Sequence, residues 1–384
     1  MDRKHYEPEH VAFGEAFRAF AEKVIVPHYL EWEKAGISPR EVFQEAGKDG
    51  FLGMAIPEEY GGGGVDDFRF NQVLGEQIAV AGITGTGLGL SLHNDICLPY
   101  FLAYANDEQK ARWLPGIASG QLITAIAMTE PGAGSDLNGI RATARRDGDA
   151  YVVNGAKTFI TNGINADLVI TAVKTGGDSS DRRGRTSLLV LERGMAGFDR
   201  GRNLDKLGLH SQDTAELSFT DVRVPVANLL GEESDGFRYL TAKLPQERTS
   251  IAIAALAEAA AGVRETLQYV KDRTAFGAAV ASFQNTKFAL AEMATEIDVA
   301  QAFLDRCVDR LSAGELTPAD ASKAKLHCTE LQGRVVDRCL QLHGGYGYMT
   351  EYPIARRYAD ARITRIYGGT SEIMKSVISR SLGL

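Results

Sequence analysis

The sequence predicts an α+β multidomain fold in three parts: an all-helical N-terminal domain over residues 1–120, a central β-barrel domain over 121–230 and a C-terminal four-helix bundle over 231–384. Two observations carry this prediction. Apolar residues recur at helical spacing in the first and last parts of the chain. In the middle part, short β-rich runs alternate with turns rich in glycine and aspartate, which favours a small barrel or sandwich over alternating βα units.

The N-terminal part opens with an amphipathic helix that we expect to stop at Pro27. Its apolar positions, three and four residues apart, are Val11, Phe13, Phe17, Phe20, Val24 and Val26. Four glycines at 61–64 interrupt the helical pattern, which resumes over 68–81. Asn106 and Asp107 have the character of a helix cap and predict a further helix after them.

Five β-rich runs mark the central part: residues 122–128, 151–154, 168–173, 187–191 and 215–224. Aspartate and glycine at 147–149 predict a tight turn, because these residues tolerate turn conformations of the backbone. The glycine-rich segment 176–185 is predicted to be a mobile surface loop.

Helix returns from Gly236 onward. We predict long helices at 246–272, 282–313 and 318–343, and shorter ones at 351–361 and 371–381. Ser282 and Thr317-Pro318 are favourable helix starts, and Gly314 is a favourable stop.

Composition and charge restrict the class of protein. The chain of 384 residues is 44% hydrophobic and carries a net charge of −8, so neither nucleic acid nor an anionic membrane is an expected partner. No basic-then-apolar leader opens the chain, and the longest apolar run, 251–261, is too short to cross a bilayer. The cysteines Cys97, Cys307, Cys328 and Cys339 show neither CxxC pairing nor metal-ligand spacing. We therefore expect reduced thiols, no metal site and a cytoplasmic location.

The most distinctive loop, residues 127–136, follows a β-rich run directly. Its glycines let backbone N–H groups approach an anion or a flat cofactor, and Thr129 and Ser135 add hydroxyl donors. The pattern is neither the P-loop nor the dinucleotide GxGxxG. The residues alone therefore leave two interpretations open, a cofactor or anion loop and a plain turn.

Glu247 is the second candidate, in the run from Leu244 to Ala252 at the predicted start of a long helix. Proline is tolerated in a first helical turn, as at Pro245, and an acidic residue there opposes the helix dipole favourably. The residues alone leave this structural role and a proton-transfer role for Glu247 equally open.

Five motifs, in order along the chain, resemble the signature of the acyl-CoA dehydrogenases. They are TEPGAGSD (129–136), NGAKTFITNG (154–163), RTAFG (273–277), QLHGGYG (341–347) and IYGGTSEI (366–373). The resemblance runs from the first helices to the last, and that family's fold has the same helical, β, helical order.

The resemblance implies FAD as the cofactor. It assigns FAD contacts to Met128, Thr129, Gly134, Ser135, Phe159, Ile160, Thr161, Arg273, Phe276, Gln284, Gln341, Leu342, Gly344, Gly345, Thr370 and Glu372. Thr129 and Thr161 would donate hydrogen bonds to the isoalloxazine ring, and Phe159 stands where the family usually has Trp.

The resemblance also implies that the adenosine half of FAD is reached from a neighbouring subunit, by Arg273, Gln284 and the 341–345 loop. Thr370 and Glu372 would close over the FAD phosphates and ribose. The residues it assigns to the acyl-CoA substrate are Ser135, Leu244, Arg248, Tyr367, Gly368 and Gly369.

The position of the catalytic base departs from the commonest family pattern. Most members place a glutamate after the tyrosine of a Tyr-Glu-Gly-Thr motif, where this chain has Tyr367-Gly368-Gly369-Thr370. The long-chain and isovaleryl-CoA dehydrogenases instead use a glutamate directly before a conserved arginine, which here is Glu247 before Arg248. The resemblance thus implies that Glu247 removes the α-proton while flavin N5 accepts the β-hydride. The Gly368 N–H would bind the thioester oxygen together with the FAD ribityl 2′-hydroxyl.

The Leu-Pro-Gln-Glu-Arg run and the Ser91-Leu92-His93 run are most similar to the long-chain type. We therefore expect dehydrogenation of a long-chain acyl-CoA, straight or branched, to the trans-2-enoyl-CoA, with electron-transferring flavoprotein as acceptor and a homotetrameric assembly. The alternatives are an isovaleryl-like enzyme, an acyl-CoA oxidase and a non-catalytic flavin- or acyl-CoA-binding subunit. We expect His343 to be a packing residue, and no metal site at His93 and Asp95.

Overall fold

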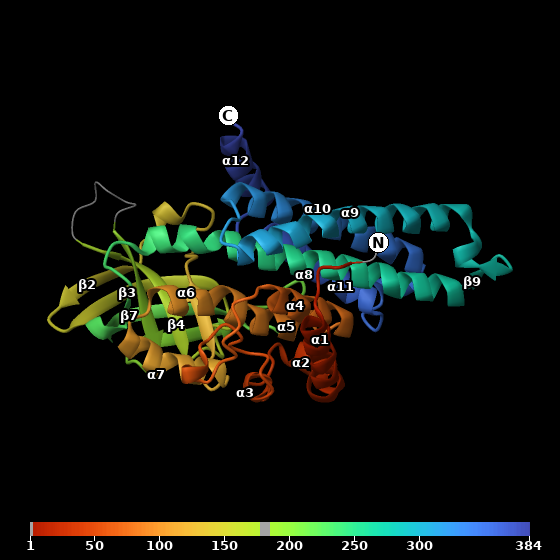
Figure 1. Ribbon diagram of the computed structural model, residues 1–384. Helices are drawn as coiled ribbons and strands as arrows, with labels where there is room; N and C mark the ends of the chain where they lie inside the picture. Colours follow the sequence, from red (N-terminus) through yellow and green to blue (C-terminus); the bar gives the residue numbers. More distant parts are fainter. Residues whose placement is uncertain (1–2, 177–184) are drawn as a thin grey trace.

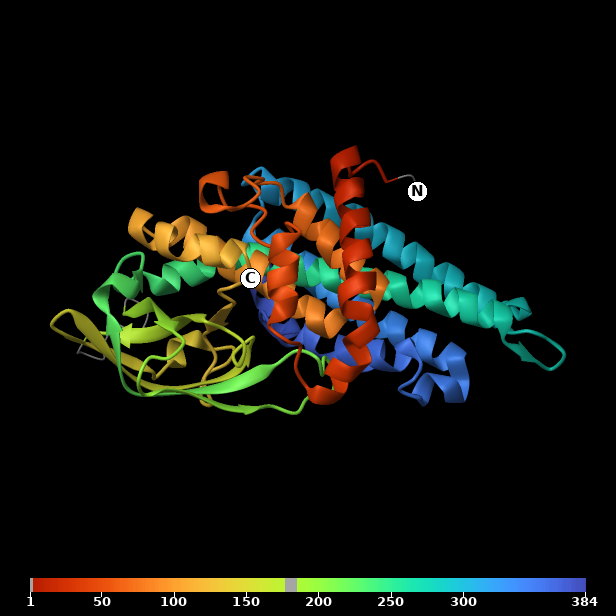
Figure 2. The same ribbon diagram turned by 90° about the horizontal axis from the view of Figure 1, so that it is seen from below.

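The computed structural model describes residues 3–176 and 185–384. Helices form the N-terminal part, a β-sheet the central part and long helices the C-terminal part, which confirms the predicted fold class. Figures 1 and 2 show the sheet at one end of the molecule and the long C-terminal helices extending away from it. The predicted mobile loop at 176–185 falls almost entirely on residues 177–184, outside the described part of the chain.

The N-terminal helices are α1 (Pro8–Phe20), α2 (Tyr29–Ala35), α3 (Glu41–Lys48), α4 (Arg69–Ala81), α5 (Thr84–Ser91), α6 (Leu98–Tyr104) and α7 (Asp107–Ala118). The predicted stop at Pro27 is wrong. The chain continues from α1 through short π and 3-10 turns into α2. Pro27 is the second residue of the 3-10 turn (Val26–His28), where its missing N–H costs no hydrogen bond. The predicted cap is confirmed: Asn106 and Gln109 form a reciprocal capping box before α7.

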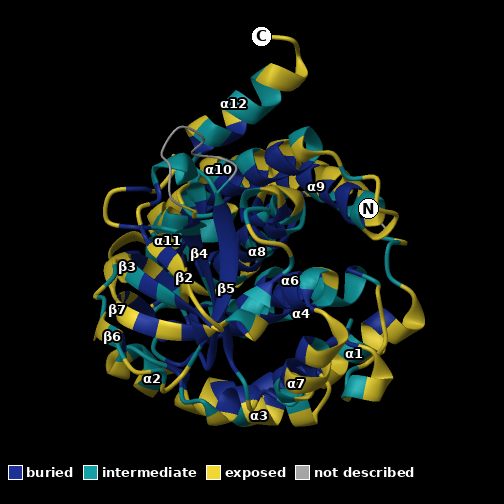
Figure 3. Ribbon diagram, turned by 90° about the vertical axis from the view of Figure 1, so that its left-hand side faces the viewer, coloured by how far each residue is buried: buried dark blue, intermediate teal, exposed yellow. Residues whose placement is uncertain are grey.

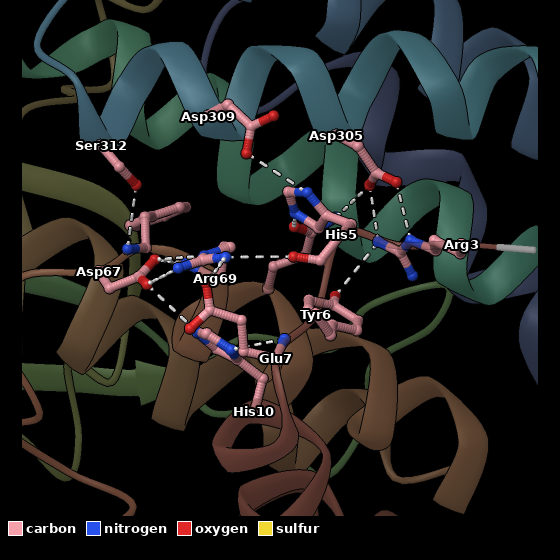
Figure 4. Close-up of polar contacts among 12 residues, drawn as sticks. Arg3, His5, Tyr6, Glu7, His10, Asp67, Arg69, Asp305, Asp309 and Ser312 are labelled. Atoms are coloured by element: carbon pink, nitrogen blue, oxygen red, sulfur yellow. Dashed lines mark hydrogen bonds and ion pairs between the residues drawn. The ribbon is translucent and has the colours of Figure 1, made fainter.

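Polar contacts fix the segment before α1 to α4 and to α9 (Gln284–Ser312), as Figure 4 shows. Arg3 donates to both carboxylate oxygens of Asp305 on α9, at 2.8 and 2.7 Å, and pairs with Glu76 on α4 at 2.8 Å. His10 Nε2 lies 3.2 Å from Asp67. The first residues of the chain therefore pack against the C-terminal bundle.

The central strands are β1 (Thr124–Ala127), β2 (Thr143–Asp147), β3 (Ala150–Thr161), β4 (Leu168–Thr175), β5 (Thr186–Glu192), β6 (Phe198–Asn203), β7 (Thr214–Pro225) and β8 (Leu229–Leu230). They form one sheet in the order β6-β7-β3-β2-β4-β5-β8, and β1 pairs with β4 in parallel. The predicted turn at 147–149 joins β2 to β3 and is confirmed. No prediction was made for β2 and β6, because their charged and polar residues break any β-rich run.

The C-terminal helices are α8 (Gly236–Asp272), α9, α10 (Pro318–His343), α11 (Pro353–Ala361) and α12 (Ser371–Ser381). A small hairpin, β9 (Thr274–Ala275) with β10 (Ala278–Ala279), joins α8 to α9. The predicted bounds of α9, α10, α11 and α12 agree with the structure to within two residues. Apolar side chains of α8, α9 and α10 form one continuous core.

The predicted start of α8 is wrong, and the error changes the interpretation of Glu247. The helix begins at Gly236 and continues through Pro245, so Glu247 lies about three turns inside it. The early turns form because Tyr239 and Leu240 are buried in the core beneath α6 and α7, and this burial outweighs the helix-breaking effect of the proline. The first-turn explanation of Glu247 is therefore excluded.

Buried residues concentrate where the three parts meet. Figure 3 shows β4, β5 and the inner faces of α8 and α10 as buried, with exposed residues on the outer helices. The functional cavity lies at this junction.

Candidate active site

A cavity lies between the N-terminal helices, the sheet and the C-terminal bundle. Its volume is about 180 Å³. Helices α4 and α5 line one side, α8 another, and strands β1 and β3 with the loops after them complete the wall. The predicted site residues that line it are Met128, Thr129, Phe159, Ile160, Thr161, Glu247, Tyr367 and Gly368.

Glu247 is the ionisable group best placed for proton transfer in this cavity. Its side chain is 3% exposed, and Tyr100 Oη donates a hydrogen bond of 2.8 Å to Glu247 Oε1. Burial raises the pKa of Glu247 to about 7, while the Tyr100 hydrogen bond and the charges of Arg248 and Lys243 act in the opposite direction. A carboxylate with this pKa can accept a proton near neutral pH.

Tyr100 was missed by the sequence analysis. It lies on α6, which follows a π-helical turn (Leu92–Cys97), a feature that often marks functional sites. In that turn Asp95 accepts a hydrogen bond of 2.5 Å from Ser250, one turn after Glu247 on α8. The turn thus fixes α6 and α8 against one another and aims the Tyr100 hydroxyl at the carboxylate. A tyrosine in an apolar run carries no sequence signal that distinguishes it from a core residue.

Gly368 forms a left-handed turn with φ of +62°. A Cβ there would lie 2.4 Å from Ile251 Cδ1 on α8, so both the backbone conformation and the close approach favour glycine. Lys325 Nζ donates to the carbonyl oxygens of Thr364 and Gly369, at 3.1 and 2.6 Å, and so clamps the turn on both sides. Within the described chain, no residue accepts a hydrogen bond from the Gly368 N–H.

A buried ion pair holds the loop after β1. Lys157 Nζ on β3 lies 2.8 Å from Glu130 Oε1 and also donates to the carbonyl oxygen of Met128 at 3.0 Å. The Glu130 carboxylate accepts the N–H groups of Arg141 and Ala142. Sequence reasoning assigned no role to Glu130 or Lys157, yet they set the position of Met128 at the cavity.

Phe159 provides a flat wall that the protein itself leaves uncovered. Its backbone has a φ of +60° within a register shift between β3 and β7, and its side chain is 67% exposed although it lines the cavity. A left-handed conformation is uncommon for a bulky residue and marks sites where the fold imposes a particular orientation. The ring is thus available to a planar ligand, flanked by Thr129 and Thr161.

Several predicted residues do not line this cavity. Gly134 and Ser135 are exposed at the tip of the loop, and Leu244 is half-buried on α8. Arg248 is buried, donates to Ser322 Oγ at 3.2 Å and has a buried Nε for which no described residue is a hydrogen-bond partner. A Cβ placed on Gly369 would lie 3.8 Å from the Arg248 guanidinium, so Arg248 adjoins the glycine turn.

Several other residues predicted to bind the cofactor lie at a second site. Arg273, Gln341, Leu342, Gly344 and Gly345 line a separate hollow at the end of the bundle. Nearby, Phe276 is 99% exposed at the tip of the β9–β10 hairpin, and Gln284 begins α9. Thr370 and Glu372 do not line this hollow: Thr370 caps α12, accepting the Ile373 N–H at 3.3 Å, and Glu372 lies in the first turn of that helix.

The two sites lie far apart on one chain. Glu247 and Arg273 are separated by 26 residues of the continuous helix α8, which corresponds to about 39 Å along its axis. A single cofactor could not contact both places on the same chain.

The two histidines considered from the sequence make contacts within the fold. His343 packs on the Tyr269 ring at 4.1 Å, and His93 contacts Ile117 and Thr124 instead of Asp95. The four cysteines are free and buried. Among the described residues, the acid and histidine group spaced for a metal is Glu7, Glu9 and His10, at the start of α1; His10 is buried, and none of the three lines the cavity. No helix in residues 3–176 or 185–384 is both long and apolar enough to cross a membrane.

Known proteins resemble this chain along nearly its whole length. Family profiles match residues 7–121 (acyl-CoA dehydrogenase, N-terminal domain), 125–222 (middle domain) and 234–383 (C-terminal domain). The long-chain specific acyl-CoA dehydrogenase of Sus scrofa mitochondria is 48% identical over 380 residues, covering 99% of this chain and 88% of that protein. The crystal structure of an acyl-CoA dehydrogenase from Geobacillus kaustophilus is 51% identical, with a TM-score of 0.97 over 99% of this chain and 100% of that chain. A glutaryl-CoA dehydrogenase from Mycobacterium smegmatis, solved in complex with FADH2, is 26% identical, with a TM-score of 0.91 over 99% of this chain and 95% of that one.

Proposed function

Because the chain belongs to the acyl-CoA dehydrogenase family of oxidoreductases, we propose that it converts a long-chain acyl-CoA, straight or branched, to the trans-2-enoyl-CoA. One observation carries the proposal: Glu247, a buried carboxyl group with a raised pKa, lines the same cavity as the glycine turn at Gly368. The long-chain assignment draws support from the 48% identity to a long-chain specific relative.

Glu247 acts as the base that removes the substrate α-proton. Its burial keeps competing water from the carboxylate. Burial also raises the pKa of Glu247 towards that of the substrate α-proton, which the neighbouring carbonyl group acidifies. The Tyr100 hydroxyl holds Oε1, which leaves Oε2 for the proton. The residue therefore has both the reactivity and the orientation that the step requires.

The Gly368 N–H orients the substrate and stabilises its developing charge. As the α-proton leaves, negative charge accumulates on the thioester oxygen, and a backbone N–H with no protein acceptor can donate to it. Lys325 fixes this turn through the carbonyls on both sides, so the donor is held in place before the substrate arrives. Arg248 beside the turn would hold the CoA portion.

The residues present fit FAD. When bound, FAD supplies the acceptor for the hydride that leaves the β-carbon. Phe159 offers an uncovered aromatic face, and the hydroxyl groups of Thr129 and Thr161 lie at the same cavity as hydrogen-bonding groups for the ring edge. Met128 and Ile160 would complete the ring site.

The adenosine end of that cofactor would be held by a second copy of the chain. The hollow lined by Arg273 and residues of the 341–345 loop lies about 39 Å along α8 from Glu247, so one FAD can reach both regions only if two copies meet. The fully exposed Phe276 beside this hollow is consistent with an interface. We propose a homotetramer that passes its electrons to electron-transferring flavoprotein.

Anaerobic bleaching of the flavin tests the function. The purified protein, mixed without oxygen with a ladder of straight and branched acyl-CoAs, should lose its yellow colour fastest with a long-chain member. A preference for short branched chains would indicate an isovaleryl-like specificity. Stoichiometric peroxide in air without an added acceptor would indicate an oxidase. Retention of colour with every acyl-CoA would show a non-catalytic binding subunit and overturn the proposal.

A further inference from the structure

The polarity of the side chains that line the cavity changes along its length. Near Glu247 its walls carry aliphatic side chains from α5, α8 and the π-helical turn: Leu88, Leu92, Ile96, Ile251 and Ala254. Its far end is lined by polar side chains from five different helical segments: Thr84, Glu258, Gln332, Asp360 and Thr364. An alkyl chain that filled the cavity would leave these polar groups facing a methyl group.

Two of the polar residues have hydrogen-bonding groups that no described residue satisfies. Gln332 is 2% exposed; its Oε1 accepts the Thr364 hydroxyl at 2.9 Å, whereas its Nε2 has no partner in the described chain. Asp360 is 7% exposed; its Oδ1 accepts the Leu209 N–H at 2.5 Å, and its Oδ2 likewise lacks a described partner. Both residues line the cavity, so a donor and an acceptor left open there suit a polar ligand group.

Glu258 and Thr84, in contrast, are fully engaged. Thr84 Oγ1 donates to Glu258 Oε1 at 2.5 Å, and Arg357 pairs with the other carboxylate oxygen while it also contacts Glu265 at 2.7 Å. This network closes the cavity as a rigid wall. The open positions therefore belong to Gln332 and Asp360.

The rise per residue of the helices gives the distance from Glu247 and the Gly368 turn to the polar end of the cavity. Glu247, Ile251, Ala254 and Glu258 share one face of α8, and the first and last are 11 residues or about 16 Å apart along the axis. On α10, Gln332 lies seven residues or about 10 Å beyond Lys325, which clamps the Gly368 turn. An extended alkyl chain advances about 1.25 Å per carbon, given bonds of about 1.5 Å. The polar end is thus about eight to thirteen carbons beyond the substrate α-carbon.

We propose that this end of the cavity is a subsite for a hydroxyl group carried by the acyl chain about eight to thirteen carbons beyond the α-carbon. A hydroxyl both accepts and donates, so it satisfies the Gln332 amide and the Asp360 carboxyl together. Burial raises the pKa of Asp360 to about 7, so the carboxyl accepts or donates according to its protonation. The inference rests on the proposed function and narrows its substrate to hydroxylated acyl-CoAs.

Matched pairs of substrates test the subsite. Anaerobic flavin reduction is measured with decanoyl-, dodecanoyl- and tetradecanoyl-CoA and with the ω-hydroxy form of each. The wild-type protein should show half-saturation at about tenfold lower concentration for a hydroxylated member of at least one pair, the effect expected when two buried hydrogen bonds replace two unpaired groups.

Two variants test whether Gln332 and Asp360 cause the preference for hydroxylated chains. Gln332→Leu removes the open amide, and Thr364 keeps its bond to the Ala361 carbonyl. Asp360→Asn retains an oxygen for the Leu209 N–H. Each variant keeps one of the two partners, so the ratio between the hydroxylated and plain chains should fall from about tenfold to about threefold. Having both variants guards against a folding defect in either.

The outcomes separate this inference from the proposed function. If plain chains reduce the flavin as readily as their hydroxylated partners in the wild-type protein, the subsite is wrong and the dehydrogenase function stands. A hydroxyl preference that stays at the wild-type level in both variants would also overturn the subsite. If no acyl-CoA of either kind reduces the flavin, the proposed function itself fails.

Discussion

Tyr100 on α6 donates a hydrogen bond of 2.8 Å to Glu247 on α8, and both side chains are buried. The contact joins an N-terminal helix to the C-terminal bundle across the cavity. It also stabilises the charged form of a carboxyl group whose burial raises its pKa to about 7. The hydroxyl thus lowers the pKa of this carboxyl group as well as orienting it.

The Tyr100→Phe substitution should move the pH profile of flavin reduction. Reduction requires ionised Glu247, so its rate rises as pH increases through the Glu247 pKa. Loss of a hydrogen bond to the carboxylate raises that pKa, and we expect the midpoint at a pH about one unit higher. Stopped-flow reduction between pH 5.5 and 9 measures it, with Tyr104→Phe on the same helix as control. An unchanged midpoint would show that Tyr100 only fills space.

Gly368→Ala should slow flavin reduction without removing the base. The new Cβ would lie 2.4 Å from Ile251 Cδ1, and alanine disfavours the φ of +62°, so the turn and its N–H must shift. Loss of one well-placed donor to an oxyanion lowers the rate by about a hundredfold or more. Rapid-mixing kinetics at saturating acyl-CoA provides the measurement. A variant that reacts at the wild-type rate would contradict the role of the Gly368 N–H.

Lys157→Met should destabilise the central domain. It leaves the Glu130 carboxyl buried without its cation, and breaking a buried pair in this way costs about 3–5 kcal/mol. Urea unfolding gives the free energy of unfolding. The double variant with Glu130→Gln should recover much of the loss, because no buried charge remains. A loss below about 1 kcal/mol in the single variant would contradict the structural role of the pair.

A site shared between subunits should show complementation. Glu247→Gln subunits keep Arg273, and Arg273→Ala subunits keep Glu247, so an interface between the two kinds contains one intact site. Co-refolded mixtures should reduce flavin although neither variant does so alone. Light scattering on the same samples gives the number of subunits. No recovery in a mixed oligomer would place the whole cofactor site within one chain.

Much of the fold was predictable, because helices such as 318–343 follow apolar periodicity and cap residues closely. The start of α8 was not: Pro245 suggested a helix start, whereas burial of Tyr239 and Leu240 continues the helix across it. At the site, the predicted pairing of Glu247 with Gly368 at one cavity was made through the family resemblance. Tyr100 could not be predicted, since its role depends on a contact across 147 residues of sequence.

The identity of the base is the central claim, and Glu247→Gln tests it most directly. The variant keeps the size of the side chain and an oxygen that can accept the Tyr100 hydrogen bond, but it cannot take up the α-proton. The rate of anaerobic flavin reduction by a long-chain acyl-CoA should fall by about three orders of magnitude, while flavin content and thermal unfolding stay at wild-type values. Reduction within a few-fold of the wild-type rate would show that Glu247 is not the base.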